Sequence, residues 1–440
     1  MQSYFVDLVE GLEKGLHAPE ILASSFSGED SDFVRFNQAR VRQAGHVVQR
    51  DITLELMRGQ RHARGSTTLT GQVEEDRLRL RHVLDELRDI VAQLPEDPHL
   101  NAPTAVHSTE RHGTNQLVPS GDLVPAILDT GRDHDMVGIL ASGGVFHGFA
   151  SSLGQRNWHS SYTYNLDWSL YHHGDKAVKC LYAGFAWEDG VFRYKMDRAR
   201  EELSLLARPA RTLAPGPYRA FLAPAAVADV LWMVGWSGFG RREHETGRTC
   251  LLHMVEGRER LHTAIAISED TEHGASPDFQ DEGFIRPPRV PLIEGGCFRH
   301  CLTSPRSARE YNQQGNGASE EEQPESLDMA AGTLPQAEVL ARLDTGLYVN
   351  NLWYLNYSDP VGCRMTGMTR FATFWVENGR IVSPVNVMRF DDTLYRMLGH
   401  NLVDLTVERD FMFTDLTYDG RSTTTARAPG ALLGELTLTL

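Results

Sequence analysis

The sequence has no run of apolar residues long enough to cross a membrane. All its hydrophobic stretches fall short of the roughly 20 residues that a spanning helix needs. Residues 1–17 carry acidic side chains and no basic cluster, which is not the pattern of a signal peptide. These absences predict a cytoplasmic protein with no membrane partner.

Cysteine is scarce and basic charge is in deficit. The five cysteines are odd in number and scattered from Cys180 to Cys363, which does not indicate a disulfide framework. Free thiols in a reducing compartment are the simplest interpretation. Lysine and arginine total 43 against 59 aspartate and glutamate, for a net charge of −16, and no basic patch stands out. We therefore expect no nucleic-acid partner.

The length and patterning predict an α+β fold. A chain of 440 residues is too long for one small core and suggests two domains. The content of 41% hydrophobic and 23% charged residues is ordinary for a folded globular protein. We expect a mixed α/β N-terminal domain over residues 1–208, followed by a largely antiparallel β-sheet C-terminal domain over residues 209–440.

In the first half, helical periodicity is clearest over residues 72–94, where Pro95 ends the pattern. Alternating apolar residues predict strands, and Glu188–Gly190 predicts a hairpin turn. Other predicted helices are residues 4–14, 120–131 and 196–207; predicted strands are two around a turn in 33–46, then 51–58, 61–69 and several within 136–193; residues 95–120 are predicted as a surface loop.

The second half has fewer helical patterns. Residues 224–236 predict a helix, and 250–267 are strand-like. Residues 312–333, rich in Gln, Gly and Glu, predict a mobile loop. From residue 345 to 390 the chain reads as short strands, with a hairpin turn at Glu377–Arg380 because Asn-Gly tolerates the positive φ angles of a tight turn.

Metal and nucleophile motifs are absent. Two histidines one helical turn apart, with a Glu beside the first, would let both imidazoles reach one zinc ion, but the chain has neither HExxH nor HExxxH. His244–Glu245 begins the motif without a second His. His107 and His112 are spaced five apart with Glu110 between them, which a solvated loop explains better. No GxSxG elbow is present.

The best metal candidate from the sequence is the segment Cys297–Cys301, which also contains His300. Three such ligands so close together, without a second cluster, make a poor tetrahedral zinc site. The pair His172–His173 is interpreted as a surface pair. The glycine-rich residues 141–148 lack the Lys-Ser/Thr of a phosphate loop, so tight strand turns explain them better.

Several separated segments, in order, resemble the TldD/PmbA (TldE) peptidase family. Together they cover nearly the whole chain, although each is weak alone. The segments are Phe33–Asn37 with Val41–Gln43, Ala150–Gly154, Leu222–Val227, Asp281–Gly283 with Pro291–Gly296, Gly315–Gly317 and Gly346–Arg389.

The resemblance implies a subunit type. Zinc-bearing members carry HExxxH on a middle helix, whereas residues 221–240 here contain neither His nor Glu. The chain therefore resembles the metal-free TldE/PmbA-type subunit, which joins a zinc-bearing TldD-like subunit. In that family the two subunits enclose a chamber that admits unfolded or small peptides and take part in peptide degradation and maturation.

We therefore expect no catalytic, cofactor-binding or metal-ligating residue in this chain, and zinc in the partner subunit. Two alternatives stay open. One is a divergent peptidase that uses Cys297, His300 and Cys301. The other is a stand-alone homodimer that binds peptides or acts as a scaffold.

Overall fold

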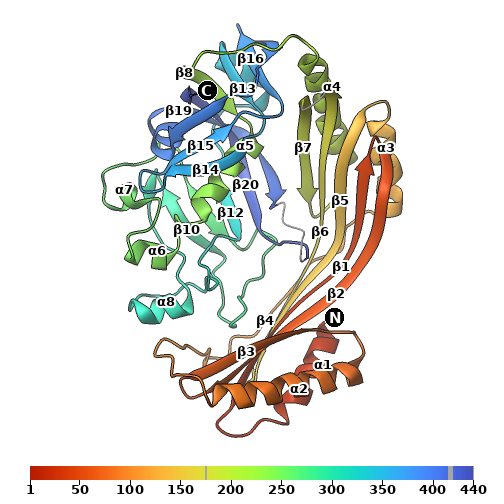
Figure 1. Ribbon diagram of the computed structural model, residues 1–440, viewed down its shortest axis with the longest axis vertical. Coiled ribbons are helices and arrows are strands. Elements are labelled where there is room, and N and C mark those ends of the chain that lie inside the picture. Colours follow the sequence, from red (N-terminus) through yellow and green to blue (C-terminus); the bar gives the residue numbers. More distant parts are fainter. Residues whose placement is uncertain (174–175, 415–419, 440) are drawn as a thin grey trace.

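Two β-sheets with helices on their faces make up the protein, so the α+β prediction is confirmed (Figure 1). The computed structural model describes residues 1–173, 176–414 and 420–439. Among the helices in these ranges, none is long and apolar enough to cross a membrane.

The first sheet is built from long strands that arch along one side of the molecule (Figure 1). Its described strands run in the order β3-β2-β1-β5-β6-β4, with β7 also paired to β6. Their bounds are β1 Ile21–Asn37, β2 Arg40–Arg58, β3 Arg61–Thr68, β4 Thr109–His112, β5 Asp135–Ser151, β6 Arg156–His173 and β7 Lys176–Gly184.

The predicted hairpin in residues 33–46 is confirmed, but the separate strand at 51–58 is wrong. Gln38 and Ala39 adopt positive φ angles of 51° and 50° at the turn. Strand β2 then continues unbroken for 19 residues, because β1 pairs with it along its whole length. Strand β2 is hydrogen-bonded to β1 on one side and to β3 on the other. These pairings extend the strand through residues 47–50, where the local sequence pattern predicts a break.

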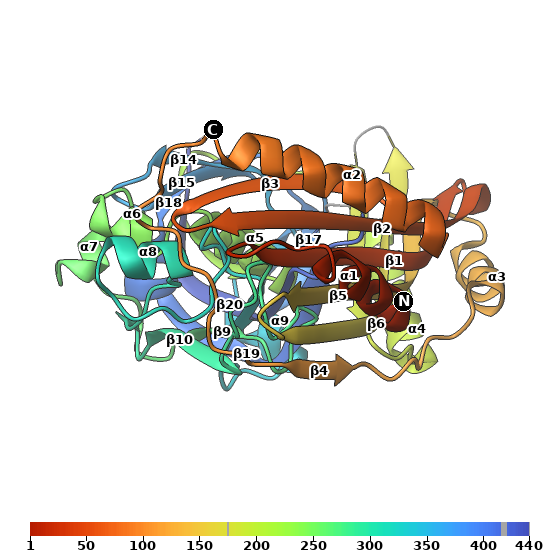
Figure 2. The same cartoon turned by 90° about the horizontal axis from the view of Figure 1, so that it is seen from below.

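Helices cover both ends of this sheet. Helices α1 (Gln2–Glu13) and α2 (Val73–Val91) pack at one end, as Figures 1 and 2 show, and bury Phe5, Leu80 and Leu84 against the strands. Helices α3 (Ser120–Gly131) and α4 (Asp189–Leu206) lie at the other end. Helices α1, α2 and α3 lie where the sequence predicts a helix, whereas α4 begins seven residues before the predicted helix 196–207.

Three local predictions differ from the structure. The turn expected at Glu188–Gly190 is the start of α4, because the N–H of Phe192 donates to the carbonyl of Glu188 and begins a helical turn. The strand expected over residues 250–267 is instead the short helix α7 (Leu252–Val255) followed by irregular chain. The loop predicted for 95–120 contains the edge strand β4, which pairs in parallel with β6.

The second sheet contains thirteen described strands and is largely antiparallel, as predicted, with parallel pairs β12–β20 and β8–β13. The strands are β8 Gly216–Leu222, β9 Ile267–Asp270, β10 Arg289–Glu294, β11 Cys297–Phe298, β12 Ser326–Met329, β13 Gly346–Val349, β14 Trp353–Asp359, β15 Arg364–Met368, β16 Thr373–Glu377, β17 Arg380–Pro384, β18 Arg389–Thr393, β19 Leu402–Phe413 and β20 Thr425–Leu438. The remaining helices are α5 Pro224–Gly235, α6 Arg241–Glu245, α8 Pro305–Glu310 and α9 Val339–Leu343, with a 3-10 turn at Gln336–Glu338 and a π-helical turn at Arg396–His400.

Turn chemistry in this half follows the sequence. The hairpin between β16 and β17 places Asn378 at φ 50° and Gly379 at φ 71°, so the Asn-Gly prediction is confirmed. The mobile loop predicted over 312–333 is wrong in part. Glu322 is 1% exposed and accepts the backbone N–H groups of Arg242 and Ser304, and the segment then enters the buried strand β12.

Polar contacts join the two sheets. The guanidinium of Arg421 donates to the carbonyl oxygens of Gly143 and Thr163 at 3.0 and 2.9 Å. Arg64 on β3 pairs with Glu282 at 2.6 Å. The arched sheet therefore contacts the C-terminal half at more than one place along its length.

The glycine-rich residues 141–148 lie inside β5, not at turns. A Cβ on Gly143 would lie 2.2 Å from the carbonyl oxygen of Asp30 on β1. We expect Gly143→Ala to lower the free energy of unfolding by about 2 kcal/mol, because β1 must move away. Gly45 on β2 is the control, since a Cβ there meets nothing within 4 Å. Gly45→Ala should leave stability unchanged or raise it by up to about 1 kcal/mol in urea titrations. Equal effects of the two changes would contradict the prediction.

Candidate functional site

Helix α5 is the middle helix at which the family resemblance would place zinc ligands. Pro224 occupies its first turn, where a missing N–H is tolerated, and no polar side chain caps it. Its side chains are apolar on nearly every face, so the helix is enclosed in the core of the C-terminal half. Its buried residues are Ala226, Val227, Ala228, Val230, Leu231, Met233, Val234 and Gly235.

Zinc does not fit this helix. The helix contains no histidine, cysteine or glutamate, and Asp229 is its one carboxylate. The Asp229 carboxylate accepts the backbone N–H of Leu352 at 3.3 Å. Across the described residues, no group of three or more His, Cys, Asp or Glu side chains could hold a metal ion.

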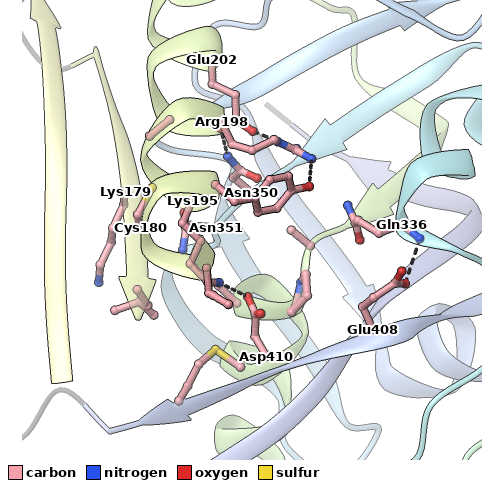
Figure 3. Close-up of a pocket in the computed structure, with 18 of the residues that line it drawn as sticks. Lys179, Cys180, Lys195, Arg198, Glu202, Gln336, Asn350, Asn351, Glu408 and Asp410 are labelled. Atoms are coloured by element: carbon pink, nitrogen blue, oxygen red, sulfur yellow. Dashed lines mark hydrogen bonds and ion pairs between the residues drawn. The ribbon is translucent and has the colours of Figure 1, made fainter. Parts of the chain in front are cut away.

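A pocket of about 430 Å³ opens at the start of α5 (Figure 3). Helix α4 and strand β7 of the N-terminal half form one wall, and α5, β13 and β19 of the C-terminal half form the other. Ala223, Pro224 and Ala225 place the first turn of α5 in its lining. The pocket therefore requires both halves of the chain.

A polar network forms one wall of the pocket. Arg198 and Glu202, one turn apart on α4, pair at 3.3 Å, and Arg198 also donates to the Tyr348 hydroxyl at 3.1 Å. The side-chain amide of Asn350, just beyond β13, donates to the other carboxylate oxygen of Glu202. These four side chains hold one another in fixed positions.

Burial changes the acidity of this network. Burial raises the pKa of Glu202 above its ordinary value, although Arg198 and Asn350 oppose the shift. Burial and the charge of Glu202 raise the pKa of Tyr348 to about 12, so the phenol stays protonated at neutral pH. Because each polar group has a partner, the wall is suited to positioning a ligand rather than to exchanging protons.

The charged residues of the pocket balance. Lys195 pairs with Asp410 at 3.0 Å, and Glu408 accepts the backbone N–H of Gln336 at 2.9 Å. The lining also includes Lys179, Arg198 and Glu202, which makes three cations and three carboxylates. Leu181, Ala199 and Met412 add apolar surface, so the pocket is amphipathic.

The His244–Glu245 candidate forms no metal site. His244 lies in α6, bonds the carbonyl of Gly238 through Nε2 at 2.7 Å and stacks on Phe298 at 4.6 Å between ring centroids. Burial lowers its pKa. Glu245 pairs with Arg241 at 3.2 Å. These contacts are structural.

The remaining histidine and cysteine candidates are dispersed. His107 lies exposed before β4, Glu110 and His112 are exposed on β4, and the exposed pair His172–His173 ends β6. Cys297 is exposed on β11, whereas Cys301 is 3% exposed and burial raises its pKa to about 11. The Cys297–His300–Cys301 segment is therefore not gathered around one point.

Sequence reasoning missed the pocket residues. Arg198 and Glu202 are an i, i+4 pair on the helix that the sequence predicts over residues 196–207 without assigning it a site. Asn350 and Asn351 directly follow a buried strand, a place where polar side chains line sites. The i, i+4 spacing of Arg198 and Glu202 can be recognised in the sequence. Their partners across the pocket, Tyr348 and Asn350, cannot, because they lie about 150 residues further along the chain.

A family comparison agrees with this architecture. Residues 215–440 match the model described as the PmbA/TldA metallopeptidase C-terminal domain, and the chain belongs to this family. No curated protein matches the chain.

Solved structures similar to the chain include TldE from Thermococcus kodakarensis, with 14% identity, a TM-score of 0.77 and coverage of 99% of this chain and 100% of that one. Another is a protein described as a modulator of a DNA gyrase from Thermotoga maritima MSB8, at 14% identity, TM-score 0.75 and 99% coverage of both chains. A protein with a similar description from Bacteroides thetaiotaomicron VPI-5482 has 14% identity, a TM-score of 0.73 and coverage of 99% and 98%. At this identity the likeness concerns the fold alone.

Proposed function

We propose that this chain is the non-catalytic subunit of a two-subunit zinc peptidase that degrades or matures unfolded peptides. In this proposal the zinc and its general base belong to a TldD-like partner, and the chain works in the cytoplasm. The observation that carries the proposal is helix α5, which is apolar on nearly every face and contains no histidine or glutamate, whereas the family resemblance assigns HExxxH to this helix in zinc-bearing members.

Family membership supports a peptidase context. The composition of α5 supports a non-catalytic role for this chain beside a zinc-bearing partner. A zinc-bound water needs metal ligands and a general base, and α5 contains no histidine or glutamate. The amphipathic pocket at the start of α5 supports a role in holding peptide near the partner's metal.

A metal-free chain can help a peptidase in two ways. Its sheet edges can hold an extended peptide through backbone hydrogen bonds, which tolerate any sequence. Strand β14 is such an edge, since it pairs with β15 alone among the described strands. Exposed aromatic residues on it, Trp353 and Tyr354, suit contact with a peptide or a subunit.

The test combines metal content with activity. We expect the purified chain to contain no stoichiometric zinc and to cleave no unfolded peptide by itself. Adding a zinc-bearing family member should give a complex that cleaves such peptides faster than the zinc subunit alone. Elemental mass spectrometry and a fluorogenic peptide assay measure both quantities. Full peptidase activity of the chain alone would exclude the proposal.

The two alternatives have their own signatures. A divergent peptidase based on the Cys297–Cys301 segment predicts one bound metal per chain and loss of activity in Cys297→Ser. A stand-alone homodimer predicts, in native mass measurements, a dimer of this chain that does not exchange subunits when the zinc-bearing relative is added.

A further inference from the structure

Glu408 is an exposed residue at the mouth of the pocket. Its carboxylate accepts the backbone N–H of Gln336 at 2.9 Å. Within the described part of the chain, no Lys, Arg or His nitrogen lies within 4 Å of this carboxylate. Glu408 is therefore accessible and can pair with a cation from another molecule.

The other charges of the lining are paired. The pairs are Lys195–Asp410 at 3.0 Å, Arg198–Glu202 at 3.3 Å and Lys179–Asp167 at 3.4 Å between side-chain nitrogen and oxygen. Because Asp167 lies outside the lining, this pairing leaves one negative charge in the pocket, that of Glu408. Figure 3 shows Glu408 and Gln336 on one side of the pocket and Lys179 and Lys195 on the other. The electrostatics at Glu408 therefore favour a cation.

The deeper part of the pocket is apolar or already hydrogen-bonded. Ala199 and Met412, which line it, are 1% and 2% exposed. The buried carboxylate of Glu202 and the buried phenol of Tyr348, also in the lining, both bond the guanidinium of Arg198. An apolar group can contact Ala199 and Met412 while these bonds stay intact. The pocket thus suits a ligand with an apolar group inside and a cation at the mouth.

Building on the function proposed above, we propose that this pocket binds the N-terminal residue of a substrate peptide. The α-ammonium group pairs with Glu408 at the mouth, and an apolar first side chain lies against Ala199 and Met412. Both groups are bonded to the same α-carbon, so one residue supplies the cation and the apolar group together. A lysine side chain carries its ammonium at the far end, so on entering the pocket it would bring that charge toward Arg198 and away from Glu408.

The experiment compares two forms of one peptide. A short unstructured peptide, with leucine as its first residue and a fluorophore at its C-terminal end, is prepared with a free amino terminus and with an acetylated one. Fluorescence anisotropy measures the binding of each to the full chain at about pH 6.5, where the α-ammonium is protonated. We expect the free amine to bind about fivefold more tightly than the acetylated form, which is the scale of one solvent-exposed ion pair.

Two further peptides test the parts of the ligand separately. A free-amine peptide with glycine in place of the first leucine lacks the apolar group and should bind about tenfold more weakly, the scale of burying most of a leucine side chain. An acetylated peptide with lysine first carries an ammonium on its side chain only, and it should bind no more tightly than the acetylated leucine peptide. Tighter binding of the lysine peptide would identify a side-chain amine as the ligand and reject the N-terminal assignment.

One substitution and its matched control locate the cation site. Glu408→Gln removes the charge but keeps an oxygen for the N–H of Gln336, so urea titrations should show unchanged stability. Glu201→Gln removes the same charge from an exposed glutamate on α4 that does not line the pocket. We expect the preference for the free amine to disappear in Glu408→Gln and to persist in Glu201→Gln.

The outcomes separate the two proposals. Equal binding of the free and acetylated peptides, or an unchanged preference in Glu408→Gln, would overturn the N-terminal site. The subunit role would still stand if the complex with a zinc-bearing relative cleaved peptides faster than that relative alone. If the chain bound none of the peptides and gave no stimulation of that relative, both proposals would be rejected.

Discussion

Replacing Arg286 by methionine is expected to lower the free energy of unfolding by about 3–5 kcal/mol at pH 7.5, because it leaves two carboxylates without their buried counter-charge. Arg286 is 8% exposed and forms a bidentate ion pair with the carboxylate of Glu325. Its charge also acts on Glu269, which is 5% exposed and lies close to Glu325. Methionine retains much of the volume, so the loss reports the charge rather than a cavity.

Urea titrations at pH 5 and pH 7.5 check this expectation. The loss of unfolding free energy should be smaller at pH 5, because Glu269 is then protonated and has no negative charge for Arg286 to neutralise. Arg289→Met is the matched control, since Arg289 is exposed and its Nε donates to the Ser268 hydroxyl at 2.9 Å. The Arg289→Met change should lower the free energy of unfolding by less than about 1 kcal/mol. A loss of the same small size for Arg286→Met would show that the cluster is not electrostatically coupled.

Glu269→Gln is expected to remove a pH dependence of about 3 kcal/mol from the stability of the protein. Burial, followed by the charge of Glu325, raises the pKa of Glu269 from 4.5 to about 7, with Arg286 opposing. A carboxyl group whose pKa is raised in the folded state contributes stability below its unfolded pKa. That contribution is lost as pH rises through the folded pKa. The window therefore runs from about pH 4.5 to pH 7, at about 1.4 kcal/mol per unit.

The measured quantity is the difference in unfolding free energy between the variant and the wild type at several pH values. This difference should increase in favour of glutamine by about 3 kcal/mol between pH 4.5 and pH 8. Glutamine keeps one side-chain oxygen for the N–H of Ser326, which donates to Glu269 at 3.0 Å. Any change in stability that the substitution causes equally at every pH does not affect the pH trend. Glu272→Gln, at an exposed position, is the control and should give a flat line. A flat line for Glu269→Gln would refute the assignment.

The elements that the sequence predicted well are those whose causes are local. Helix α2 follows from the periodic spacing of Leu80, Leu84 and Leu87, and the β16–β17 turn follows from Asn378–Gly379. Helix α5 follows from an apolar run that Pro224 begins. Each is fixed by contacts within one turn or one hairpin, so a single sequence reveals it.

The failures have a shared physical cause. Residues 250–267 carry enough apolar side chains for a strand. Most of these side chains are buried in the core of the C-terminal half, but no neighbouring strand among the described residues pairs with residues 250–266. Residues 312–333 are polar enough for a mobile loop, yet buried Glu322 is held by the backbone N–H groups of Arg242 and Ser304. Composition cannot report partners that arrive from distant parts of the chain.

The sequence by itself determined the α+β class, the apolar character of the middle helix and the absence of His and Glu on it, because these depend on residue identity and short spacing. Tertiary structure alone decided that the start of α5 opens into a pocket with Arg198, Glu202 and Asn351. Those side chains come from different halves of the chain, and hydrogen bonds from Arg198 to Tyr348 and from Asn350 to Glu202 join the two sides.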